Sequence, residues 1–224
     1  MKTKKICALS HPNIAFIKYW GNQVDSINLP SNGSISMNLS NLETITEVHF
    51  NSKLLDDELF INGVKQSERP LSRVTAILDI VRNQSNVSLK ACVSSTNNFP
   101  LGAGIASSAS AFAALALAAS KAAGLHLSQI ELSKLARKGA GSACRSIPGG
   151  FVEWIKGSSD EDSYAIQLAP PEHWQLNDCI AITDEREKKV SSSTGHQMAP
   201  SSPLQQARIA SSPIRMDICR SAIK

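Results

Sequence analysis

The chain has 224 residues, of which 42% are hydrophobic, and carries a formal net charge of +4 at pH 7. This length is enough for a substantial buried core. The Lys and Arg residues alternate with acidic residues and form no basic stripe, so we expect no nucleic-acid partner. No segment approaches the roughly 20 apolar residues of a membrane span, so we expect no membrane partner either. A basic pocket for an anionic small molecule remains compatible with this composition.

The cysteines and histidines argue against a secreted or a metal-binding protein. The cysteines form no C-x-x-C pair, and the histidines show no H-x-x-x-H spacing, so we expect no protein-bound metal. The N-terminal lysines are not followed by the apolar stretch of a secretion signal. We therefore expect a cytoplasmic protein with reduced cysteines.

Short β-type runs dominate the first part of the chain. They span residues 14–19, 35–39 and 44–50, and residues 59–61 followed by Asn62-Gly63 predict a hairpin with a type I′ turn. Behind Pro70, hydrophobic residues recur at spacings of three and four, which predicts an amphipathic helix through Leu71, Val74, Leu78 and Val81. A further strand is expected at residues 87–93.

The second part of the chain is expected to be mixed. Residues 97–104 form a small-residue loop that leads into an Ala-rich helix ending near Gly124. Ser128 and Glu131 have the spacing of a capping box and predict a second helix directly after it. We also expect strands around residues 150–155 and 179–183, a low-complexity tract at 191–202, and a helix that starts at Ser212-Pro213.

The strongest chemical signal is the small-residue loop that opens the Ala-rich helix. Small residues let the backbone approach an anion closely, and the free N–H groups at a helix start bind phosphate. Ser107 and Ser108 add hydroxyl donors. A tight loop with a serine cap would explain the same residues equally well. The loop is not of the Walker A type, because G-x-x-x-x-G-K-[ST] does not occur in the chain.

Two further clusters offer cations. Residues 139–145 place Ser142 and Arg145 near a helix end, where a hydroxyl and a guanidinium could share a phosphate or a carboxylate. Residues 18–21 offer a lysine and a phenol beside an apolar wall. An arginine paired with a carboxylate, and a strand with core aromatics and an extended lysine, are the ordinary alternatives. The spacing of the acidic residues identifies no general base.

Taken together, these clusters resemble the diphosphomevalonate decarboxylases, within the GHMP kinase superfamily. The first and third of the matching blocks are specific to these decarboxylases rather than to the small-molecule kinases. The blocks that match, in order, are Asn13–Gly21, Asn97–Pro100 with Gly104–Ala109, Gly141–Ser146 with Gly149–Trp154, and Lys188-Lys189 with Ser192–Thr194.

The resemblance implies an α+β, GHMP-kinase-like fold, with residues 1–185 as an N-terminal ATP-binding domain and residues 186–224 as the start of a truncated C-terminal domain. It implies ATP-dependent decarboxylation of 5-diphosphomevalonate to isopentenyl diphosphate, with release of ADP, phosphate and CO2. Magnesium is expected as the partner of ATP, and a homodimer is expected from the family.

The resemblance also assigns residues to sites. The ATP site is expected to contain Asn97, Ala103, Gly104, Ala106, Ser107 and Ser108. The substrate site is expected to contain Tyr19, Trp20, Gly21, Asn22, Arg69, Ala140, Gly141, Ser142, Ala143, Cys144, Arg145 and Thr194. Lys18 and Arg145 are expected beside the reacting centre as the catalytic residues.

The chain departs from the family pattern at three places. Asn22 stands where the family usually has Lys, and Ala140 stands where it usually has Ser. Both changes remove a donor near the expected terminal phosphate, which favours 5-phosphomevalonate as an alternative substrate. The family's catalytic aspartate, in an Asp-Ala-Gly-Pro-Asn segment, has no counterpart. A non-catalytic nucleotide-binding protein, and a kinase that stops before decarboxylation, are therefore further alternatives.

Overall fold

The computed structural model describes residues 4–100, 105–181 and 191–224. Within these residues the strands form a five-stranded sheet in the order β1-β6-β9-β7-β8, a four-stranded sheet in the order β11-β10-β5-β2, and a small pair, β3-β4. The strands are β1 Ile6–Ser10, β2 Asn13–Ile17, β3 Asn22–Val24, β4 Leu29–Pro30, β5 Ser34–Asn38, β6 Thr44–Asn51, β7 Glu58–Ile61, β8 Val64–Gln66, β9 Lys90–Asn97, β10 Phe151–Trp154 and β11 Ala165–Ala169. The α-helices are α1 Glu68–Gln84, α2 Ser107–Ala122, α3 Gln129–Gly139, α4 Ser192–Met198 and α5 Gln205–Ile223.

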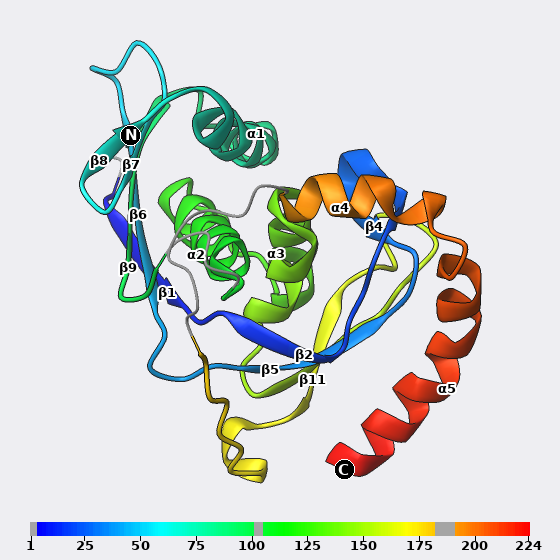
Figure 1. Cartoon of the computed structure of the whole chain (residues 1–224). Coiled ribbons are helices and arrows are strands. Elements are labelled where there is room, and N and C mark those ends of the chain that lie inside the picture. Colours follow the sequence, from blue (N-terminus) through cyan, green and yellow to red (C-terminus); the bar gives the residue numbers. More distant parts are fainter. Residues whose placement is uncertain (1–3, 101–104, 182–190) are drawn as a thin grey trace.

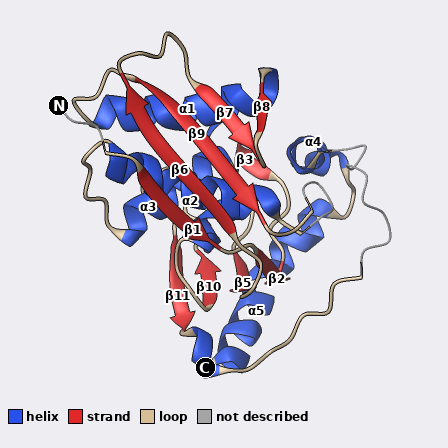
Figure 2. Cartoon of the chain, turned by 90° about the vertical axis from the view of Figure 1, so that its left-hand side faces the viewer, coloured by secondary structure: helices blue, strands red, loops and turns tan. Residues whose placement is uncertain are grey.

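The five-stranded sheet carries helices α1, α2 and α3 on one face (Figures 1 and 2). Strand β6 alternates buried and more exposed residues along its length, as expected for a strand with one covered face. Helix α2 is buried nearly all round, and its alanines allow the sheet and both neighbouring helices to approach closely. This packing fixes the start of α2, where the small-residue loop lies.

The four-stranded sheet separates an apolar layer from a polar one. Along β5, Ile35 and Met37 join the core cluster that includes Met216 and Ile223 of α5. Ser34 and Ser36 alternate with these residues and point to the opposite face of the sheet, where their hydroxyl oxygens accept hydrogen bonds from the buried Arg145. Helix α5 therefore covers one face of this sheet (Figure 1), and the other face holds the polar site described below.

Most of the expected elements are confirmed. The hairpin at Asn62-Gly63 joins β7 and β8, with both turn residues at positive φ. The amphipathic helix is α1, and its expected apolar positions 74, 78 and 81 are buried. The capping box at Ser128 and Glu131 is present at the start of α3. The α+β class follows from this mixture of sheets and separate helices.

Three expectations about elements are wrong. The strand expected at 87–93 is β9, three residues later, because its pairing with β6 runs from Lys90 to Asn97. Residues 179–181 form no strand, and the rest of the segment expected as a strand, 182 and 183, lies outside the described residues. Pro213 lies inside α5 instead of at its start, since the helix already packs on the sheet from Gln205.

The tract 191–202, rich in Ser, Thr and Pro, contains helix α4, whose first turn is capped by Ser191.

Strands β1 and β11 were not anticipated from the sequence; each is stabilised by pairing with β6 or β10 rather than by a strong pattern of its own. No helix in the described part of the chain has the length and apolar character needed to cross a membrane.

Candidate active site

The loop after β2, residues 18–21, forms one wall of a polar cluster. Tyr19 meets Trp154 edge to face, with ring centroids 4.6 Å apart, and stacks on His196 with centroids 4.3 Å apart. A Cβ atom on Gly141 would lie 2.5 Å from the Tyr19 hydroxyl oxygen, so the close approach requires glycine there. We call the cluster formed by Lys18, Tyr19, Gly141 and Arg145 the substrate cluster.

Arg145 is the centre of this cluster and is only 3% exposed. Its guanidinium donates to the hydroxyl oxygens of Ser36 and Ser34 at 3.1 and 2.5 Å and to Asn13 Oδ1 at 3.0 Å. It also lies 5.9 Å from the centroid of the Tyr19 ring. All of these partners are neutral. Among the residues that the structure describes, Arg145 contacts no carboxylate.

The electrostatics of the substrate cluster favour an anionic ligand. Burial lowers the pKa of Arg145 from its ordinary value, but an arginine remains charged in proteins. Burial, and secondarily the positive charge of Arg145, lowers the pKa of Lys18. Burial raises the pKa of the Tyr19 phenol, which stays protonated and can donate a hydrogen bond. A buried cation without a counter-ion is costly, and an anion placed beside it offsets that cost.

The residues expected around Arg145 lie in a 3-10 helix, Gly141–Ser146, that follows Ala140 at the end of α3. Asn13 connects this helix to β2 by donating to Ser142 O at 3.1 Å and to Ser146 Oγ at 2.8 Å. Ala143 is buried in the core. The Cys144 thiol is buried and donates to Gly141 O, and burial raises its pKa to about 12, so it is a structural thiol and not a nucleophile.

The remaining substrate-site predictions lie around this core. Trp20 is 41% exposed and contacts His196, and Gly21 adopts a φ of +82°. Asn22 donates to Asp25 Oδ1 at 3.0 Å, while its own Oδ1 is buried without a partner among the described residues. Thr194 lies in α4, beside the residues that contact Trp20.

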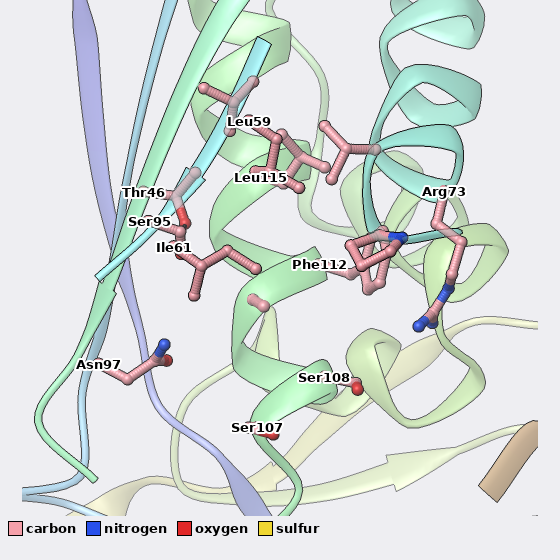
Figure 3. A pocket seen from close by; sticks show the side chains of 14 residues that line it. Thr46, Leu59, Ile61, Arg73, Ser95, Asn97, Ser107, Ser108, Phe112 and Leu115 are labelled. Atoms are coloured by element: carbon pink, nitrogen blue, oxygen red, sulfur yellow. Dashed lines mark hydrogen bonds between the residues drawn. The ribbon is translucent and has the colours of Figure 1, made fainter. Parts of the chain in front are cut away.

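A second feature is a cavity of about 140 Å³ between α1, α2 and the large sheet. Its apolar side is formed mainly by Leu59, Ile61, Val74, Val93 and Leu115. Asn97 lines it from the end of β9, and Ser107 and Ser108 line it from the first turn of α2 (Figure 3). The cavity thus has an apolar part and a polar end at a helix N-terminus, where phosphate is favoured.

The start of α2 has unusual backbone geometry. Ala106, its N-cap residue, has a φ of +51°, in the left-handed region that an alanine rarely adopts. Such strain is concentrated at functional sites. The two other residues that the resemblance assigns to this loop, Ala103 and Gly104, lie outside the described residues, as do Lys188 and Lys189.

The sequence did not indicate Arg73, which lines the cavity. Its guanidinium carbon lies 4.7 Å from the centroid of the Phe112 ring, and its Nη2 donates to Gly139 O at 2.9 Å (Figure 3). Burial lowers its pKa, and the nearby charge of Arg69 contributes. Arg69 itself is exposed in the first turn of α1, one turn before Arg73. The sequence offered only the helical spacing of the two arginines as a signal.

Helices α4 and α5 also contribute residues that the sequence did not indicate. His196 Nδ1 accepts from the Gly21 N–H at 3.0 Å, Gln205 donates to Trp20 O at 2.6 Å, and Arg208 donates to Lys18 O at 2.5 Å. No local pattern could reveal these contacts, because they join residues more than 170 positions apart. We call His196, Gln205 and Arg208 the loop clamp.

Comparisons with known proteins agree with this arrangement. Residues 10–165 match the family described as diphosphomevalonate decarboxylase-like N-terminal domain. A diphosphomevalonate decarboxylase of Candida albicans is 40% identical over 200 residues, covering 83% of this chain and 55% of the relative. A crystal structure of mevalonate diphosphate decarboxylase from Staphylococcus aureus has 39% identity and a TM-score of 0.89, covering 98% of this chain and 67% of that one.

A solved structure described as MDDEF in complex with MVAPP, AMPPCP and magnesium is also 39% identical, with a TM-score of 0.88 over 98% of this chain and 68% of that one. The chain spans about half the length of the curated relatives it matches. The family match, residues 10–165, spans the residues of the substrate cluster, and the structural likeness extends over 98% of this chain.

Proposed function

Because the chain belongs to the diphosphomevalonate decarboxylase family, we propose that it serves the ATP-dependent decarboxylation of 5-diphosphomevalonate to isopentenyl diphosphate, with release of ADP, phosphate and CO2. The observation that carries this proposal is the buried Arg145, whose described partners are all neutral. Such a cation is suited to the carboxylate and phosphates of this substrate, and Lys18 adds a second positive charge.

We propose that ATP binds at the cavity beside α2. A purine would lie against its apolar lining, and the phosphates would lie at the first turn of α2 near Ser107, Ser108 and Arg73. The described lining residues include no carboxylate. We therefore propose that magnesium is held by the ATP phosphates and water, as is common for nucleotide-bound magnesium, with no carboxylate ligand from this lining.

The proposed reaction has two stages. The γ-phosphoryl group of ATP is transferred to the tertiary 3-hydroxyl, whose proton is lost, and ADP leaves. The bond from carbon 3 to the phosphate oxygen then breaks, and phosphate leaves with the bonding electron pair. The bond between carbon 2 and the carboxylate carbon breaks as CO2 leaves, and the electron pair of that bond forms the new double bond between carbons 2 and 3. Arg145 and Lys18 stabilise the negative charges that are gathered and released. We assign the general base to none of the described residues.

A second candidate substrate, 5-phosphomevalonate, is favoured by the surroundings of Asn22. Its amide donates to the Asp25 carboxylate at 3.0 Å, and its own Oδ1 has no described partner. The resemblance assigns Asn22 and Ala140 to the region of the terminal phosphate, where the Asn22 amide already donates to Asp25 and Ala140 offers no side-chain donor. A substrate with one phosphate fewer would avoid that mismatch.

The test is a coupled assay of the 224-residue chain with ATP and magnesium, in which 5-diphosphomevalonate and 5-phosphomevalonate are supplied separately and ADP and CO2 are followed together. Calorimetric titration of each ligand accompanies it. Release of both products, with one substrate preferred, supports the proposal and identifies the substrate. Binding of ATP without binding of either mevalonate ester would instead support a non-catalytic nucleotide-binding protein, and ADP without CO2 would support a kinase.

We further propose that the protein acts as a homodimer in the cytoplasm. Membership of the diphosphomevalonate decarboxylase family supports this proposal. Sedimentation of the purified chain tests the oligomeric state, since a single monomeric species at micromolar concentration would contradict it.

A further inference from the structure

We propose that His196 is a positioning residue that holds the loop 18–21 in place, and that it does so only as the neutral imidazole with its proton on Nε2. That His196 holds the loop follows from the contacts of its ring alone. That the loop in turn supports substrate binding rests on the proposed function. No feature of the sequence pattern indicated this histidine, which lies in the tract 191–202.

The ring of His196 contacts the loop through two aromatic rings and one hydrogen bond. Its ring stacks on Tyr19 with an interplanar angle of 14° and centroids 4.3 Å apart, and it lies 4.6 Å from the Trp20 ring. Its Nδ1 is 3.0 Å from the backbone nitrogen of Gly21. One side chain of α4 therefore contacts three successive residues of the loop, including the phenol that faces Arg145.

The hydrogen bond from Gly21 determines which protonation state of the His196 ring can hold the loop. A backbone N–H can only donate, so Nδ1 must be an unprotonated acceptor, and the neutral ring carries its proton on Nε2. A second proton would be placed on Nδ1, directly facing the Gly21 N–H. The bond would be lost, and two positively polarised hydrogens would oppose each other.

The surroundings favour the neutral form. Burial lowers the pKa of His196 to about 4; Asp25 opposes this effect and Arg208 adds to it. The other titratable group in contact is Tyr19, whose own pKa is raised by burial. At neutral pH the ring is therefore uncharged, and the interaction is present in full; acid removes it as the ring gains a proton.

The other members of the loop clamp do not share this sensitivity. Gln205 donates to Trp20 O, and Arg208 donates to Lys18 O and to Asn32 Oδ1. A glutamine does not titrate, and an arginine keeps its proton. Gly21 fits between the clamp residues because it has no side chain; a Cβ there would lie 2.8 Å from Gln205 Nε2. Within the loop clamp, His196 is thus the member whose charge changes with pH.

The first experiment needs no variant and no ligand. Nitrogen-15 NMR of the imidazole side chains in the wild-type chain at pH 7 should show His196 with a bare Nδ1 and a proton on Nε2. The Gly21 amide should exchange slowly with solvent at that pH. A proton on Nδ1, or a charged ring at pH 7, would overturn the proposal.

Three variants separate the stacking of the His196 ring from its hydrogen bond with Gly21. His196→Phe keeps the ring and removes the acceptor, so the Gly21 amide should exchange about tenfold faster relative to wild type, the effect of one lost hydrogen bond. His196→Asn keeps an acceptor near the Nδ1 position and should restore most of the protection. His126→Asn, at an exposed histidine, is the control and should leave the Gly21 amide unchanged.

Ligand binding is measured on the same proteins. We expect His196→Phe to weaken 5-diphosphomevalonate binding by about fivefold to tenfold and to leave binding of a non-hydrolysable ATP analogue unchanged, since the ring lies beside the substrate cluster. Equal Gly21 exchange in His196→Phe and wild type would refute the role of His196. A wild-type chain that shows the expected tautomer and protection but binds no mevalonate ester would refute the proposed function alone.

Discussion

Two buried arginines, eight residues apart in the sequence, show how the same side chain can serve the fold or the site. Arg137 is fully buried at the end of α3, where it forms an ion pair with Asp160 and donates to Ile27 O. Arg145 is 3% exposed in the next helical segment, and its described partners are Ser34, Ser36 and Asn13. The first charge is paired with a carboxylate within the fold, and the second has neutral partners among the described residues.

The difference follows from what each arginine connects. Arg137 joins α3 to two loops, and Lys138 shares the same carboxylate at 2.7 Å, so two cations surround Asp160. Arg145 is held by hydroxyl and amide oxygens, which orient the guanidinium without cancelling its charge. A carboxylate partner therefore distinguishes Arg137 from Arg145, whose described partners are neutral, and this difference supports the proposal that Arg145 binds an anionic ligand.

The largest expected loss of stability follows from replacing the paired arginine, Arg137. Replacing Arg137 by Met removes the hydrogen bonds that its buried guanidinium donates to Ile27 O and to Asp160, each worth about 1.5–3 kcal/mol, so the free energy of unfolding should fall by about 3–5 kcal/mol. Urea denaturation followed by tryptophan fluorescence measures this loss. A variant as stable as wild type would show that the Arg137–Asp160 pair does not hold the fold.

The tight contact at the substrate cluster should be nearly as sensitive. In Gly141→Ala the new Cβ would lie 2.5 Å from the Tyr19 hydroxyl oxygen and 3.1 Å from the Trp154 ring. We expect a loss of roughly 1–3 kcal/mol of stability, typical of overpacking. Gly149→Ala is the matched control, because the nearest heavy atom is 4.0 Å away there. Equal losses in the two variants would contradict the contact.

The loop clamp predicts a pH dependence. His196 has a pKa of about 4 in the folded chain and an ordinary value of 6.5, so between these values the unfolded chain binds more protons. Stability should therefore fall as the pH falls from about 6.5 to about 4, by about 2–3 kcal/mol from this group. His196→Phe should remove that part of the slope in urea titrations at a series of pH values. An identical slope in both proteins would contradict the pKa shift.

The smallest expected change in stability is at the unpaired arginine. Arg145→Met replaces a buried charge without a described counter-ion by an apolar side chain of similar length. The loss of free energy of unfolding should be smaller than in Arg137→Met, because removing the desolvation cost of the charge offsets the hydrogen bonds lost to Ser34, Ser36 and Asn13. A loss as large as that of Arg137→Met, measured in the same urea experiment, would show that Arg145 is a structural residue.

The elements with strong local patterns could be predicted from the sequence. The heptad-like spacing of α1, the capping box of α3 and the Asn62-Gly63 turn each act within a few residues. Strand β9 was placed three residues too early because its limits are set by pairing with β6, not by its own composition. Pro213 was expected to begin a helix, but packing of α5 on the four-stranded sheet extends the helix on both sides of it.

The site could be predicted only in part for the same reason. The sequence identified Arg145 as one of two alternatives, a ligand-binding or a paired arginine. What decides between them is the set of partners on β2 and β5, more than 100 residues away. His196, Gln205 and Arg208 were missed because their contacts with the loop 18–21 span more than 170 residues. The expected boundary between residues 185 and 186 falls outside the described residues and stays a prediction.

The central claim is that Arg145 binds an anionic ligand. Calorimetric titration of 5-diphosphomevalonate into wild type and Arg145→Met tests it most directly, with an ATP analogue as the control ligand. We predict that the variant loses about 100-fold or more in affinity for the mevalonate ester, equivalent to about 2.7 kcal/mol, because hydrogen bonds to a charged group are lost. Its affinity for the ATP analogue should be unchanged. Equal affinity of both proteins for the mevalonate ester would contradict the account.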